Sequence, residues 1–164
     1  MDTDHCGRAA CSYFFTVRLE DHRCESLIEH VDALCLAFKA CRDRYPFAMT
    51  AGVILPDHLH CVLSLPSAGV SRDAQWRLIK SLFESTVDCG RDLWKPDFDE
   101  RRIEDDLELS WQVDNIHADP VRHGLVRSPI DWPYSSFHAY VAHGLRPVYW
   151  RADDRAPSPA RRAA

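Results

Sequence analysis

Two histidines one residue apart, His58 and His60, stand in a strongly apolar stretch that reads VILPDHLHCVLSL. In a β-strand, residues two positions apart point to the same face of the sheet. His58 and His60 would therefore project together, while Leu59 between them would point into the core. Two neutral imidazoles side by side can chelate a divalent ion or grip a phosphate group. Taken alone, the pattern favours two solvent-facing histidines on a half-exposed strand, because a metal site needs a third ligand.

The segment VDNIHADPVRHGLV at 113–126 offers that third ligand, since it is polar and helix-like. His117, Asp119 and His123 could each coordinate a metal ion, and the residue types alone do not choose among them. The same segment also fits an exposed helix end, where Arg122 and His123 would complement the negative end of the helix dipole.

A hairpin must position the histidine pair, because Pro56–Asp57 forms a tight turn between two apolar segments. Aromatic and β-branched residues predict strands over 12–19, 47–55, 58–65 and 98–103. Apolar spacing predicts four helices: one from a Ser26/Glu29 capping box to the RYP at 44–46, one over 72–87 capped by Ser71, one over about 105–117 ending near Pro120, and a short one within 131–144. The β-α-β-β-α-β-α order predicts a ferredoxin-like (split βαβ) α+β fold, an antiparallel sheet with helices packed on one face.

The 164 residues suit a single domain, and 46% apolar content is typical of a globular protein. We expect the domain to cover 12–150, after an N-terminal extension at 1–11 and before a disordered tail at 151–164. No apolar run is long enough to span a bilayer, and the N-terminus does not resemble a secretory signal. A cytoplasmic protein without a membrane partner is therefore expected.

The net charge of −5 counts against a nucleic-acid partner, because such proteins are usually basic. The excess is local. The segment at 88–108 holds nine acidic and four basic residues, which accounts for the whole imbalance. An acidic segment therefore interrupts a chain that is otherwise balanced in charge.

Four segments carry a resemblance to a known family, in the order VILPDHLHCVLSLP, WRLIKSLF, NIHADPVRHGLV and DWPYSSFHAYVAHGLRP. Together with SYFFTV they closely resemble the REP-associated tyrosine transposases, single-tyrosine transposases of the HUH nuclease superfamily, from Tyr13 to Trp150. The resemblance implies the ferredoxin-like fold. It also implies that His58 and His60 hold a Mg²⁺ or Mn²⁺ ion, which polarises a scissile phosphate in single-stranded DNA. In the family, a tyrosine on the following helix attacks that phosphate, and a polar residue one turn later completes the metal site.

This chain departs from the family pattern at both helical positions. The tyrosine position is Asn115, whose carboxamide cannot form a phosphotyrosine intermediate. The ligand position is Asp119, where the family usually has asparagine; the carboxylate keeps an oxygen ligand and adds a charge. We therefore expect metal binding at His58, His60 and Asp119, with tyrosine-dependent strand transfer absent or severely reduced.

The resemblance implies single-stranded or hairpin DNA as the partner of a monomer or homodimer, with Arg77, Lys80, Arg122 and His123 as DNA contacts. Acidic residues replace family bases at 88–108, which should weaken DNA binding, most of all at low salt. Two other functions stay open: a catalytically inactive DNA-binding descendant, and a metal-dependent phosphodiesterase that uses water. The second would need His117 or Asp114 as its general base.

Overall fold

A four-stranded antiparallel sheet forms the centre of the computed structural model, which describes residues 10–21, 23, 25–87, 92–154 and 158. Its strands are β1 (Cys11–Arg18), β2 (Ala48–Ile54), β3 (His58–Leu65) and β4 (Asp99–Arg102), in the spatial order β2-β3-β1-β4. Each predicted strand is present within one residue at either end. The order and the antiparallel pairing confirm the split βαβ arrangement.

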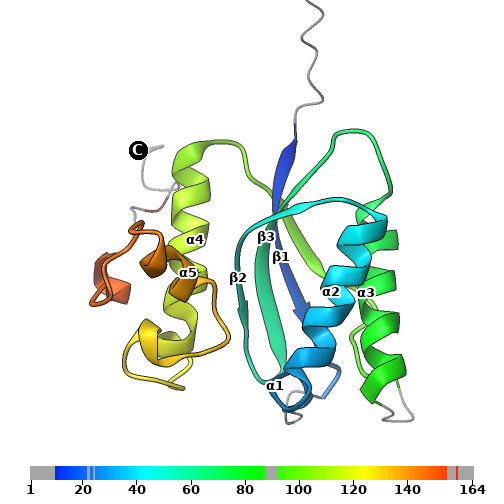
Figure 1. Cartoon of the computed structure of the whole chain (residues 1–164), viewed down its shortest axis with the longest axis horizontal. Helices are drawn as coiled ribbons and strands as arrows, with labels where there is room; N and C mark the ends of the chain where they lie inside the picture. The colour runs from blue at the N-terminus through cyan, green and yellow to red at the C-terminus, as the bar shows by residue number, and fades with distance from the viewer. Residues whose placement is uncertain (1–9, 22, 24, 88–91, 155–157, 159–164) are drawn as a thin grey trace, which may run out of the picture.

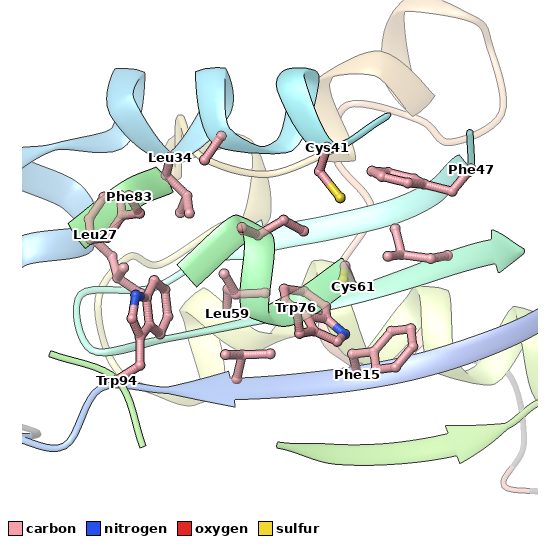
Figure 2. Close-up of a cluster of buried hydrophobic side chains, with 14 of the residues drawn as sticks. Phe15, Leu27, Leu34, Cys41, Phe47, Leu59, Cys61, Trp76, Phe83 and Trp94 are labelled. Carbon is pink, nitrogen blue, oxygen red and sulfur yellow. The ribbon is translucent and has the colours of Figure 1, made fainter. Parts of the chain in front are cut away.

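One face of the sheet is covered by α2 (Val31–Arg44) and α3 (Arg72–Val87) (Figure 1). Figure 2 shows the apolar core between these helices and the strands, where Phe15 and Leu59 meet Trp76 of α3. The rings of Phe15 and Trp76 meet edge to face with centroids 5.3 Å apart. This core fixes β1 and β3 and leaves the other face of β3, which carries His58 and His60, for a different partner.

That partner is α4 (Asp106–Arg122), which packs across the opposite face of the sheet (Figure 1). The prediction that the helices share one face is therefore wrong for α4. The reason is that β3 has apolar residues on both faces: Cys61 belongs to the core under α2 and α3, whereas Val62 packs with Val113 and Ile116 of α4. A two-sided apolar strand needs cover on both sides.

The first predicted helix is interrupted at His30, which separates α1 (Ser26–Glu29) from α2. The predicted capping box is wrong, because Glu25 is the N-cap of α1 and no side chain caps it. The cap predicted for α3 is confirmed, since the Ala74 N–H donates to Ser71 Oγ at 3.2 Å.

The helix predicted to end near Pro120 instead continues through it to Arg122. It stops in a Schellman motif, in which the Gly124 N–H donates to Val121 O and the Leu125 N–H donates to Pro120 O, each at 2.9 Å. Gly124 has φ +71°, a left-handed conformation that glycine adopts without strain. The extra turn keeps Asp119 helical, one turn after Asn115.

The C-terminal part folds over α4 and the outer edge of β2. It contains η1 (Pro129–Asp131), the predicted short helix α5 (Phe137–Ala142) and η2 (Ala152–Asp154). Ser135 forms a bridge with Val53 of β2, which covers part of that edge.

The tail predicted to be disordered from 151 begins with the short helical turn η2. Most of the remaining tail, and residues 1–9 of the N-terminal extension, lie outside the described residues, so the domain limits stay a prediction. Within the described ranges, every helix is too short or too polar to cross a membrane.

Candidate functional site

His58 and His60 lie side by side on the face of β3 that α4 covers, as their spacing predicts. Their ring centroids are 4.9 Å apart, and both residues are half-buried. The ring of His60 stacks on Phe14 of β1 with centroids 5.5 Å apart.

Each imidazole has one nitrogen engaged by a neighbouring side chain. His58 Nδ1 lies 2.7 Å from Asp57 Oδ1, and His60 Nδ1 lies 2.8 Å from Thr16 Oγ1. Thr16 is directly opposite His60 in the β1–β3 register. Such contacts orient a histidine and leave its second nitrogen for a metal ion.

The pKa of His58 is lowered from its ordinary value. Burial is the main cause, and the neighbouring His60 and His123 act in the same direction, whereas the hydrogen bond to Asp57 opposes them. His58 is therefore held toward the neutral form, which is the form that binds a metal ion.

Asp119 brings a carboxylate to the histidine pair from α4. The residue is only 4% exposed, and its Oδ2 lies 2.9 Å from His60 Nε2 and 3.8 Å from His123 Nε2. Burial acts to raise the pKa of Asp119, but His60, His123 and Arg122 outweigh burial and hold that pKa below its usual range. The carboxylate is therefore charged at neutral pH.

The Oδ2 atom of Asp119 is buried, yet it accepts no hydrogen bond of normal geometry from the described part of the chain. It faces the imidazole nitrogens His60 Nε2 and His123 Nε2 instead. A cation held between the carboxylate and the imidazoles would be bound by these atoms. The donor set of imidazole nitrogen and carboxylate oxygen suits a divalent metal ion.

Among the described residues, His58, Asp119 and His123 bring three ligand atoms within 4.8 Å of one another. Of the three candidates for a third ligand, the structure thus brings Asp119 and His123 to the histidine pair. His60 adjoins this cluster through its contact with Asp119.

Asn115 lies one turn before Asp119 and lines a cleft of about 520 Å³ beside the histidine pair. Its Oδ1 accepts a hydrogen bond from a guanidinium nitrogen of Arg122 at 2.9 Å. A second nitrogen of Arg122 lies 3.4 Å from Asp119 Oδ1. Arg122 thus contacts both Asn115, at the position of the family's tyrosine, and Asp119, the candidate metal ligand.

His117, the remaining candidate for the third ligand, points away from the cluster. It is fully buried between aromatic rings of the C-terminal part, and its Nε2 lies 2.9 Å from Ser136 Oγ. Burial, helped by the charge of Arg146, lowers the pKa of His117 to about 3. Asp114 is also buried and pairs with Arg146. Neither His117 nor Asp114 lines the cleft, so the water-using phosphodiesterase hypothesis loses both of its candidate general bases.

The residues predicted to contact DNA fall on two sides of the sheet. Arg122 and His123 lie at the cluster, and both are exposed. Arg77 and Lys80 are on α3, which covers the opposite face. The ammonium group of Lys80 donates to the backbone oxygens of Lys95 and Asp97, at 2.7 and 3.3 Å, and so holds a loop. The structure does not bring Arg77 and Lys80 to the cleft.

Sequence reasoning missed two residues that orient the site, Asp57 and Thr16. The hairpin pattern assigns Asp57 only to a turn, although its place directly before His58 is a usable signal. Thr16 is 44 residues from His60 in sequence and meets it only through strand pairing, so no local pattern could identify it.

Comparisons with known proteins give a consistent relationship. A REP-associated tyrosine transposase of Escherichia coli is 40% identical over 144 residues, which is 87% of this chain and 86% of that protein. A Haemophilus influenzae protein named for the same family is 32% identical over 84% of this chain and 86% of its own length. A solved structure of a REP-associated tyrosine transposase bound to a REP hairpin is 36% identical, with a TM-score of 0.82 over 87% of this chain and 86% of that one. No protein-family model matches the chain. With this identity over most of its length and the shared fold, the chain belongs to the REP-associated tyrosine transposase family.

Proposed function

We propose that this chain binds single-stranded or hairpin DNA at the cleft beside α4, holds a divalent ion there, and has lost tyrosine-dependent strand cleavage. Family membership supports the DNA partner, since the solved relative with 36% identity is bound to a REP hairpin. The observation that carries the proposal is the convergence of His58, His60 and Asp119 one helical turn from Asn115.

His58, His60 and Asp119 would hold the ion, Mg²⁺ or Mn²⁺, through two imidazole nitrogens and a carboxylate oxygen. A bound ion of this kind supplies Lewis-acid polarisation of a phosphodiester oxygen. Asp57 and Thr16 orient the two imidazoles.

Arg122 lines the cleft and adds a positive charge to it. Its guanidinium is held by Asn115 and Asp119, and the side chain is 47% exposed, so it stays available to a phosphate.

Asn115 decides whether bound DNA can be cut. Its carboxamide has no ionisable hydroxyl, so it cannot attack phosphorus and carry the DNA as a covalent ester. The chain would therefore bind its DNA and hold an ion without cutting the strand. The nearest alternative is a descendant that binds DNA but has also lost its ion site, and the grouping of ligand atoms of His58, Asp119 and His123 within 4.8 Å of one another favours a retained site.

The test restores the nucleophile. The Asn115→Tyr variant is incubated with a labelled hairpin oligonucleotide that carries single-stranded flanks, in the presence of Mn²⁺, and covalent adducts are separated on a denaturing gel. Asn115→Phe is the matched control, because it also loses the bond to Arg122 and adds a ring, but it has no hydroxyl. We expect an adduct with Asn115→Tyr only.

An adduct with the unaltered chain would contradict the proposal, because another nucleophile would then be in place. A lack of adduct with Asn115→Tyr would contradict the claim that only the nucleophile is missing. Anisotropy of the labelled oligonucleotide checks binding separately, and no binding by the unaltered chain would overturn the DNA partner.

A further inference from the structure

His123 sits beside the candidate ion site although it lies outside the histidine pair. It is the C-cap of α4, and its N–H donates to Asp119 O at 2.9 Å. Its ring meets the ring of His58 edge to face with centroids 5.1 Å apart, and its Nε2 is 3.8 Å from Asp119 Oδ2. The side chain is 46% exposed, so one side of the imidazole faces the cluster and the other faces solvent.

A second helix in the same chain shows what a C-cap histidine looks like without a site. His143 caps α5 and precedes Gly144, which has φ +71° like Gly124. Its N–H donates to Ala139 O at 3.0 Å, the same bond that His123 makes. Among the described residues, however, the His143 ring meets no other ring and no carboxylate. The position of the His123 ring is therefore not a consequence of helix capping alone.

The buried carboxylate gives an independent indication of a cation. Asp119 Oδ2 is without an aligned hydrogen bond in the described structure, although His60 Nε2 is only 2.9 Å away. Two ligands that each lie about 2.1 Å from one ion, at a right angle, are about 3 Å apart. The spacing of these two atoms is that of a direct ion pair, and it also equals the spacing of neighbouring ligands of one ion.

The two oxygens of Asp119 have different neighbours. Oδ1 faces the guanidinium of Arg122 at 3.4 Å, whereas Oδ2 faces the imidazoles of His60 and His123. Arg122 therefore does not occupy the position that an ion would take, and His123 stands on the ion's side of the carboxylate.

We propose that His123 is a further ligand of this ion, and that the nitrogen-rich set of His58, His60, His123 and Asp119 selects a first-row transition ion such as Mn²⁺, Co²⁺ or Zn²⁺ over Mg²⁺. Mg²⁺ prefers oxygen ligands, whereas imidazole suits transition ions. This inference rests on the proposed function, because it concerns the same site. It moves His123 from the predicted DNA contacts to the ion's ligands.

Direct titration of the full chain tests this inference. Mn²⁺, Co²⁺ and Mg²⁺ are each titrated by calorimetry, with and without the hairpin oligonucleotide, and bound Co²⁺ is also followed by its visible absorption, which reports its ligands. The variants are His123→Ala, His58→Ala and the matched control His143→Ala. Thermal unfolding checks whether all three variants fold. We expect His123→Ala and His143→Ala to fold, because both histidines are exposed.

We expect Co²⁺ and Mn²⁺ to bind at least tenfold more tightly than Mg²⁺. His123→Ala should weaken Co²⁺ binding by about tenfold or more, since even partners of metal ligands contribute that much. It should also change the Co²⁺ spectrum, and His143→Ala should change neither.

Unaltered Co²⁺ binding in His123→Ala, with binding lost in His58→Ala, would overturn this inference and leave the proposed function standing. A preference for Mg²⁺ would likewise overturn it. If none of the three ions bound with or without the oligonucleotide, both this inference and the ion site of the proposed function would be wrong.

Discussion

Asp119 and Asn115 lie on the same face of α4, one turn apart, but they affect the site in opposite ways. Asp119 brings a buried negative charge to a cluster of imidazoles, which strengthens the attraction for a cation. Asn115 supplies only an amide, which holds Arg122 and has no group to attack phosphorus. The residue types therefore support the proposal of a site that binds an ion without cleaving DNA.

His117 gives a prediction for stability against pH. The unfolded chain takes up a proton on this histidine near pH 6.5, whereas the folded chain keeps it neutral down to about 3. The unfolded state thus binds more protons between these values, and the free energy of unfolding falls as the pH is lowered. The contribution of His117 is up to about 1.4 kcal/mol per pH unit.

Denaturant unfolding at successive pH values below 6.5 measures this dependence. The matched variant is His117→Gln, which keeps a polar group near Ser136 but does not titrate. It should show a shallower loss of stability on acidification. Equal slopes for the two proteins would mean that His117 is not held neutral by the fold.

At the scale of elements, α4 matters most, because it carries Asn115, Asp119 and the C-cap His123. Its last turn continues past Pro120 and stops at Gly124 in a left-handed conformation. The position of His123 therefore depends on how this helix ends.

Gly124→Ala tests that dependence, with Gly144→Ala as a matched control. Both glycines have φ +71°, and at both an added Cβ would meet no atom within 4 Å, so only the backbone conformation is penalised. Each variant should lose about 1 kcal/mol of unfolding free energy. Only Gly124→Ala should also weaken Co²⁺ binding in calorimetry. Equal Co²⁺ affinities of the two variants would show that Co²⁺ binding does not depend on how α4 ends.

The predictability of these elements depends on the range of the interactions that form them. The period-two pattern of β3 predicted that His58 and His60 share a face, and helical spacing placed Asp119 one turn after Asn115. The face on which α4 packs could not be read locally, because it depends on residues of β2 and β3 buried on both sides. For the same reason, the sequence does not show that Arg77 and Lys80 lie on the other side of the sheet from Arg122 and His123.

Over the whole molecule, the sheet separates α2 and α3, which cover the structural core, from α4 on the other side (Figure 1). The cleft is lined by residues of α4 and of the strands. The acidic segment reaches the cleft through Asp99 and Glu100, which line it. Their charges would oppose the phosphates of a bound DNA strand, whereas Arg101 and Arg122, which also line the cleft, would attract them. Affinity for DNA should therefore be limited by this local charge.

Asp99→Asn should raise the affinity for the hairpin oligonucleotide. The substitution removes a negative charge at the cleft and releases Arg18, which pairs with Asp99. A change of about 1 kcal/mol, or about fivefold, is expected at low salt and should shrink as salt is added. Anisotropy titrations over a salt series measure it, with Asp32→Asn on α2 as the control. An equal gain for both variants would show that only net charge matters.

A retained ion site is tested most sharply by calorimetric titration of the unaltered chain and of His58→Ala/His60→Ala with Mn²⁺, alone and with the hairpin oligonucleotide. We predict that the unaltered chain binds one Mn²⁺ ion and that the double variant binds none while remaining folded. The ion site would then have outlasted the nucleophile, and Asn115 would be the main lesion. Absence of Mn²⁺ binding by the unaltered chain under both conditions, or equal binding by the double variant, would contradict a retained ion site at the histidine pair.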